Sequence, residues 1–153
     1  LLKMGKASLA VAAETQARLN MAMADAFVAG WATKYAVSLL RPVTYVQVVI
    51  DSNWVPTLMA TPPFPEYPSG HSVQSSAAAT VLGKVFGTET SFTDNTHNDR
   101  GWGPRTFKSF KAAADEAAIS RMYAGIHFGF GIEGGKVQGQ CVGAKILALK
   151  FKP

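Results

Sequence analysis

Three short segments carry residue types that can bind an anion and move a proton. They are Lys34–Pro42, Pro68–His71 and Ser120–His127. Lys34 and Arg41 are seven residues apart in a stretch that predicts one helix, so both cations should point the same way, roughly 10 Å apart along the axis. A single such pair is usually solvated. Here the chain has few charges, and the pair lies near Trp31 and the Pro42 boundary, which favours a binding role.

The second segment, Pro-Ser-Gly-His, predicts the start of a helix. Ser69 is a typical N-cap, and the first turn of a helix presents backbone N–H groups and the positive end of the helix dipole. Ser69 and Gly70 can therefore cradle an anion, and His71 can pass a proton near neutral pH. The plainer interpretation is a capped helix start with an incidental histidine.

The third segment places Arg121 in apolar, alanine-rich surroundings. An unpaired guanidinium is costly there, so Arg121 should meet a bound anion or a carboxylate. His127 follows six residues later, about 120° around a regular helix. The two side chains should approach a common site from different sides. Taken alone, His127 could equally be a satisfied core histidine.

The elements that must position these segments are predicted to be helices, with two long loops. Helices are expected over about 13–40, 73–86, 107–127 and 133–149. In the first, an apolar stripe at spacing four should face the core: Leu19, Met23, Phe27, Trp31 and Tyr35. Pro42 should end that helix. Loops are expected over 51–68 and 88–104, and no substantial sheet. The fold class is therefore all-α, a single helical domain over residues 1–153.

Composition narrows the function classes. The 153 residues hold one cysteine, Cys141, which excludes an internal disulfide framework and a zinc site built on cysteines. A net charge of +5 suits an anionic partner. No apolar run is long enough to cross a bilayer. A nucleic-acid-binding domain would need basic residues spread over one exposed face. The motif cations are instead expected in one pocket, so we expect small-molecule partners and no nucleic acid.

Together the three segments resemble one family. The patterns K-x6-R-P, P-S-G-H and S-R-x5-H look like the three motifs of the superfamily of type 2 phosphatidic acid phosphatases and vanadium-dependent haloperoxidases. They occur in that order, separated by 25 and 48 residues. The resemblance implies a helical bundle that holds a tetrahedral oxyanion. It also implies a soluble protein, secreted or periplasmic.

The resemblance assigns roles by motif position. The vanadate cofactor, or phosphate in the same site, would be held by Lys34, Arg41, Ser69, Gly70 and Arg121. His127 would bond to the vanadium or phosphorus, and His71 would be the acid–base group facing it. With Lys34, these two histidines form the expected catalytic set. Three cations would stabilise the five-coordinate geometry of in-line displacement.

Two chemistries remain open. Trp31 and Phe64 resemble the halide pocket of chloroperoxidase-type members, which favours oxidation of a halide by hydrogen peroxide. The alternatives are a soluble acid phosphatase working through a phosphohistidine, or a catalytically weakened oxyanion-binding homologue. The haloperoxidases of the family carry more helices before the lysine motif. We therefore expect a minimal version or the C-terminal part of a longer protein, its inner helix faces exposed or covered by another chain.

One position departs from the family pattern. Members usually carry an aspartate four residues after the histidine that bonds the oxyanion, and Gly131 stands there in this chain. Loss of such a partner weakens a metal site by roughly 10- to 100-fold. The sequence therefore predicts a poorly oriented His127, and that Gly131→Asp would tighten vanadate binding and raise turnover. Glu133 is close in sequence, but spacing does not tell whether it reaches the ring.

Overall fold

The computed structural model describes residues 7–56 and 58–151 and is mostly helical, which confirms the all-α fold class. Its elements in chain order are α1 (Leu9–Val37), α2 (Pro42–Val49), α3 (Gly70–Phe86), β1 (Phe92–Asp94), the short 3₁₀ helix η2 (Asn98–Arg100), β2 (Arg105–Phe107), α4 (Phe110–Tyr123) and α5 (Gly129–Leu147). The two strands pair antiparallel, with Thr93 opposite Thr106. Within the described residues, no helix is long and apolar enough to cross a membrane.

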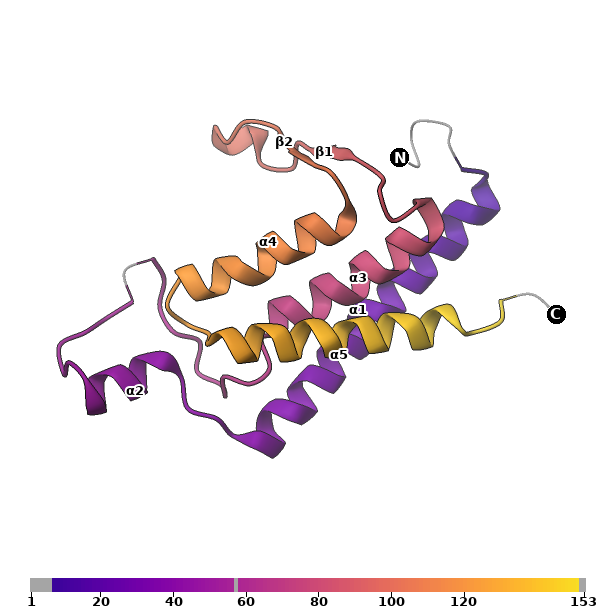
Figure 1. Ribbon diagram of the computed structural model, residues 1–153. Helices are drawn as coiled ribbons and strands as arrows, with labels where there is room; N and C mark the ends of the chain where they lie inside the picture. The colour runs from indigo at the N-terminus through magenta and orange to yellow at the C-terminus, as the bar shows by residue number, and fades with distance from the viewer. Residues whose placement is uncertain (1–6, 57, 152–153) are drawn as a thin grey trace.

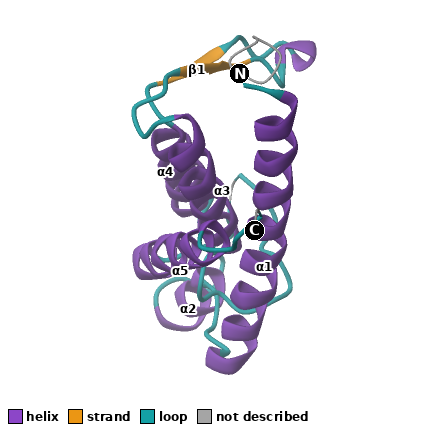
Figure 2. Ribbon diagram, turned by 90° about the vertical axis from the view of Figure 1, so that its right-hand side faces the viewer, coloured by secondary structure: helices purple, strands orange, loops and turns teal. Residues whose placement is uncertain are grey.

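Helix α3 lies at the centre of the bundle. It packs against α1, α4 and α5, and α1 also contacts α5 (Figure 1). Figure 2 shows α1 running the height of the bundle beside the other helices. The buried core includes Ala22 and Ala26 of α1, Val73 and Ala77 of α3, and Ile146 of α5. Helix α2 lies to one side of this bundle, and the β1–β2 hairpin lies beyond the start of α4.

Glycines of α5 allow this helix to pack closely against α3. Gly135, Gly139 and Gly143 are buried at spacing four and face α3. A Cβ at Gly139 would lie 2.9 Å from the carbonyl carbon of Val73 and 3.0 Å from the nitrogen of Ala77, and closer still to the Val73 oxygen. Since these neighbours are backbone atoms, the two helices touch main chain to main chain. The sequence indicated only that glycines mark the turn before this helix.

Gly139→Ala is expected to destabilise the bundle. The added methyl must push α5 away from α3, and such overpacking costs about 1–3 kcal/mol, against a gain of up to about 1 kcal/mol in helix propensity. Chemical denaturation followed by circular dichroism measures the change in the free energy of unfolding. Gly129→Ala is the matched control, because nothing lies within 4 Å of a Cβ there. Equal stability of the two variants would contradict the close approach.

The stripe that α1 buries differs from the predicted one. The buried residues are Thr15, Arg18, Ala22, Ala26, Gly30 and Lys34. Of the predicted stripe, Met23, Phe27 and Tyr35 are 39%, 43% and 61% exposed. The prediction was wrong for these three residues, whereas Leu19 packs against the core and Trp31 is half-buried. The fully buried face of α1 consists mainly of small side chains, with Arg18 and Lys34. Other large apolar residues of α1 and α2 are also exposed: Val28, Val37, Tyr45, Val48 and Val49.

Candidate active site

Arg41 does not share a helix with Lys34, which corrects the geometry expected from the sequence. Helix α1 ends at Val37, and Ser38 takes a left-handed backbone conformation with φ of 50°. Arg41 is extended and is the N-cap of α2, with Pro42 at its first position. Pro42 thus begins a helix rather than ending one, a place that proline favours. The turn at Ser38 allows the Arg41 side chain to reach His127.

Lys34 is completely buried, and its ammonium group holds the loop before α3. Nζ donates to the carbonyl oxygens of Pro65, Glu66 and Pro68 at 2.9, 3.0 and 2.5 Å. Burial and the positive charge of Arg41 lower the pKa of Lys34 to about 8, while the Glu66 carboxylate acts in the opposite direction. All three hydrogens of the ammonium group are therefore donated to backbone carbonyls, and the positive charge of Lys34 lies next to the Pro-Ser-Gly-His segment.

His127 is buried between a cation and a carboxylate. It lies in the connection between α4 and α5, not on the predicted helix, because α4 ends at Tyr123. Arg41 Nη1 lies 3.1 Å from His127 Nε2 and also donates to the Ile126 carbonyl at 2.8 Å. On the other side of the ring, Nδ1 lies 2.8 Å from Oε1 of Glu66. Burial is the main cause that lowers the pKa of His127, and Glu66 opposes it.

The Pro-Ser-Gly-His segment begins α3 as predicted. Ser69 is the N-cap, and its hydroxyl oxygen accepts the Ser72 N–H at 3.4 Å. The Ser69 N–H donates to the Gly131 carbonyl at 2.9 Å, which fixes the segment against the start of α5. His71 is exposed, yet its pKa is lowered by partial desolvation and by the charges of Arg121 and His127. The two histidines and Arg121 therefore share one electrostatic environment.

Arg121 approaches the same region from the end of α4. Its Nη2 lies 3.0 Å from the sulfur of Met59, and its Nε is buried without a hydrogen-bond partner. Arg41 Nη2 is likewise buried and unpartnered. Burial lowers the pKa of both guanidiniums, and Arg121 also lowers the pKa of Arg41 by repulsion. Unpaired charged donors are costly when buried, so the pair fits an oxyanion that accepts both.

An aromatic wall lies beside these cations. Trp31 stacks on Phe27 with ring centroids 3.9 Å apart and lies 5.2 Å from Phe64. The Arg41 guanidinium and the Lys34 ammonium lie 5.0 and 5.3 Å from the centroid of Phe64. A Cβ at Gly70 would lie 3.0 Å from the Trp31 ring. The structure thus places both predicted halide-pocket residues next to the motif cations, and their role stays a prediction.

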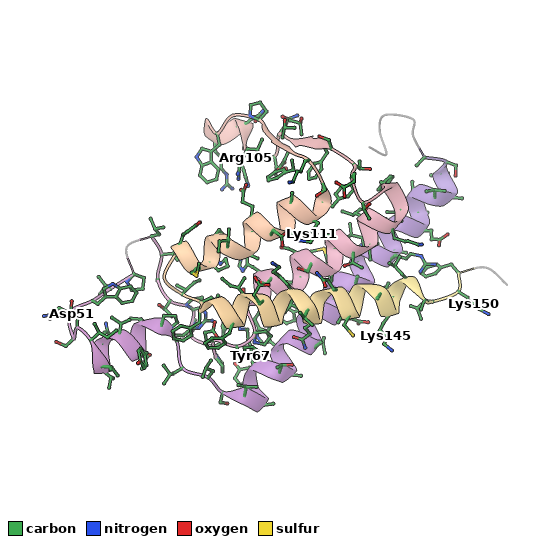
Figure 3. All side chains as sticks on the ribbon, in the orientation of Figure 1. Asp51, Tyr67, Arg105, Lys111, Lys145 and Lys150 are labelled. Carbon is green, nitrogen blue, oxygen red and sulfur yellow. The ribbon has the colours of Figure 1, made fainter. Side chains whose placement is uncertain are left out.

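A groove borders the cationic cluster, and a separate cavity lies elsewhere in the bundle. A groove of about 350 Å³ is bordered by Arg41, Phe64 and neighbouring residues of α2 and the proline-rich loop. A cavity of about 380 Å³ lies between α3, α4 and α5, lined in part by Lys84, Lys111 and Asp115. Figure 3 labels Lys111 on α4, away from Tyr67 and the loop before α3. The second cavity shares no lining residue with the motifs.

Glu66 is the residue in contact with His127 that sequence reasoning did not select. It is completely buried, and its Oε1 also accepts the Phe128 N–H at 3.0 Å. A Cβ at Gly131 would collide with this carboxylate, lying 2.6 Å from Oε2. The prediction of an unoriented His127 was therefore wrong, and Glu133 does not reach the ring but pairs with Lys136 at 3.1 Å. A lone acid in a proline-rich loop directly before a motif was the available signal.

Comparison with known proteins identifies the fold and the family of the chain. A family model described as the second helical-bundle domain of VCPO matches residues 46–152. The crystal structure of a bacterial vanadium-dependent iodoperoxidase is 51% identical, with a TM-score of 0.82, over 87% of this chain and 32% of that one. The holo-type structure of a bacterial vanadium-dependent chloroperoxidase is 19% identical, with a TM-score of 0.70, over 84% of this chain and 34% of that one. The apo-type structure of a bacterial vanadium-dependent chloroperoxidase is also 19% identical, with a TM-score of 0.66, over 80% of this chain and 33% of that one.

The likeness to the chloroperoxidase concerns the fold, whereas that to the iodoperoxidase also extends to sequence. No curated protein is significantly similar to the chain. The chain spans about a third of the length of the solved structures that it matches. From the family model, the helical bundle and the 51% identity, we conclude that the chain belongs to the vanadium-dependent haloperoxidase superfamily.

Proposed function

We propose that the chain carries the oxyanion centre of a vanadium-dependent haloperoxidase. Bound vanadate would supply the centre at which hydrogen peroxide oxidises a halide. In this reaction, halide, hydrogen peroxide and one proton give hypohalous acid and water, and two electrons pass from the halide to the peroxide. The observation that carries the proposal is a buried, unpartnered donor on each of Arg41 and Arg121, with the Arg41 guanidinium 3.1 Å from the Nε2 of His127.

Different residues of the chain would bind the oxyanion, bond to its central atom and transfer the proton. Arg41 and Arg121 bind the oxyanion and neutralise its charge, with the hydroxyl of Ser69 and the backbone N–H of Gly70 at the start of α3. Lys34 adds a third positive charge and holds the preceding loop. His127 offers Nε2 to the central atom. His71, exposed and neutral near pH 7, accepts or donates the proton at the open side.

Similarity to an iodoperoxidase makes iodide the first halide to test. The purified chain should bind orthovanadate, and it should oxidise iodide with hydrogen peroxide only when vanadate is present. The absorbance of triiodide measures this oxidation. Hydrolysis of p-nitrophenyl phosphate is measured beside it. Phosphatase activity without vanadate-dependent iodide oxidation would establish the phosphatase alternative. Binding of vanadate without either activity would identify a weakened oxyanion-binding homologue.

Two arginine variants separate specific binding from general charge. Arg121→Gln should weaken vanadate binding about 10- to 100-fold, the value of one charge-assisted hydrogen bond. Arg105→Gln is the matched control, since Arg105 is exposed and pairs with Glu116 on the surface. Equal loss in both variants would mean that vanadate binds through the net charge of the chain and not through the motif site.

A further inference from the structure

A buried carboxylate of the loop before α3 is hydrogen-bonded to the imidazole of His127. Glu66 is 0% exposed, and its Oε1 accepts from His127 Nδ1 at 2.8 Å and from the Phe128 N–H at 3.0 Å. Two backbone hydrogen bonds hold Glu66 in this loop. The Glu66 N–H donates to the Leu39 carbonyl at 2.9 Å, and the Glu66 carbonyl accepts from Lys34. The carboxylate is therefore fixed relative to the ring.

The contacts on the two ring nitrogens determine the tautomer of a neutral His127. A guanidinium can only donate hydrogen bonds, and an ionised carboxylate can only accept them. Arg41 Nη1 faces Nε2 at 3.1 Å and Glu66 Oε1 faces Nδ1. The proton must then be on Nδ1 and the lone pair on Nε2. This is the form in which Nε2 can bond to an electrophilic vanadium or phosphorus atom, whereas the other tautomer would turn an N–H toward Arg41.

Gly131 completes the arrangement from α5. A Cβ there would lie 2.6 Å from Oε2 and 2.8 Å from Cδ of Glu66, and would overlap Oε1. The Glu66 carboxylate thus fills the space into which a side chain at position 131 would project. Position 131 is where the resemblance expects an aspartate that orients the histidine. The nearest alternative in sequence, Glu133, is exposed and pairs with Lys136.

We propose that Glu66 is the positioning residue of His127, supplying from the loop before α3 the carboxylate that the resemblance expects on α5 at position 131. The inference rests on the proposed function for its catalytic meaning. Its structural content, a carboxylate relocated 61 residues from the histidine and a glycine that leaves room for it, stands on the contacts themselves. Glu66 and Gly131 should therefore behave as a coupled pair.

The test compares four variants with the wild type: Glu66→Gln, Glu66→Ala, the double variant Glu66→Ala/Gly131→Asp, and Glu133→Gln as the exposed control. Two quantities are measured. The ¹⁵N chemical shifts of His127 report the tautomer in the absence of vanadate. Titration of orthovanadate gives the affinity. We expect Glu66→Ala to mix the tautomers and weaken vanadate binding about 10- to 100-fold, the usual effect of removing a partner of a metal-bound histidine.

Glu66→Gln should lose a smaller factor, because its amide oxygen can still accept from Nδ1 while the charge is lost. The double variant should recover at least tenfold in affinity over Glu66→Ala and restore the Nδ1–H form. Glu133→Gln should match the wild type. If Glu66→Ala does not fold, Glu66→Gln and the double variant decide between the outcomes.

Wild-type tautomer and affinity in Glu66→Gln, together with no recovery in the double variant, would overturn the role of Glu66. The proposed function fails separately, since absence of vanadate-dependent iodide oxidation in the wild type leaves the tautomer measurement intact. A purely structural role of Glu66 would lower stability in Glu66→Ala without changing the ¹⁵N shifts of the folded variants, and would also overturn the inference.

Discussion

His127→Asn is expected to reduce vanadate-dependent iodide oxidation by about 10³-fold or more, since it removes the ring nitrogen that lies 3.1 Å from the Arg41 guanidinium. The asparagine amide can still donate to the Glu66 carboxylate, which keeps that buried acceptor satisfied. The fold should therefore survive, as measured by thermal unfolding. Halide oxidation is measured at saturating hydrogen peroxide and over a range of vanadate concentrations.

His97→Asn is the matched control for this variant. His97 is exposed in the connection between the two strands, where its ring meets the edge of Trp102. Its replacement should leave both vanadate affinity and rate unchanged. Residual activity above about a tenth of the wild-type rate in His127→Asn would show that the oxyanion is held by Arg41 and Arg121 alone. His127 would then be a structural histidine, the plainer interpretation of its sequence.

The fold class could be predicted from the sequence because it follows from local patterns, and contacts between the three motif segments agree with their expected proximity. Alanine-rich segments ended by glycine or proline indicate helices, and Ser69 caps α3 as expected. Three segments with cations, a hydroxyl and histidines could be assigned to one site because their order and spacing resemble a known family. Neither inference required knowledge of how distant segments pack.

The geometry within the site could not be predicted, because it depends on local breaks without a strong signal. Ser38 adopts a left-handed conformation that is unusual for serine, so Arg41 leaves the predicted helix. The sequence pattern predicted that Pro42 ends the first helix, but proline is also common in the first turn of a new helix. The interpretation of His127 as helical failed similarly, since α4 ends four residues earlier.

Glu66 and the buried face of α1 show a second limit. The contact between Glu66 and His127 joins residues 61 apart, and no periodicity encodes it. On α1, hydrophobicity marked Phe27 and Tyr35 as core, whereas the bundle selects the small residues that permit close helix packing, such as Ala26 and Gly30. A sequence pattern records which side chains are apolar, but the partner helix determines which of them it can accommodate.

Gly131→Asp is expected to destabilise the protein and weaken vanadate binding, the opposite of the gain that the sequence alone suggested. The new Cβ would overlap the Glu66 carboxylate, which is completely buried and held by His127 and the Phe128 N–H. A second carboxylate would also face the first at close range, and two such groups cannot both ionise without a large cost. We expect a loss of about 3–5 kcal/mol in the free energy of unfolding, as for other uncompensated buried charges.

Gly131→Ala separates the steric from the electrostatic part of this loss. It introduces the same Cβ without a charge, so the difference between the two variants measures the repulsion between the carboxylates. That difference should shrink as the pH falls, because a proton shared between the two acids removes the repulsion, and urea unfolding at pH 7 and pH 5 measures it. A Gly131→Asp variant with wild-type stability and tighter vanadate binding would mean that Glu66 can leave His127 freely. The space beside the imidazole would then be open to either acid, and the glycine would no longer be explained by the carboxylate packed against it.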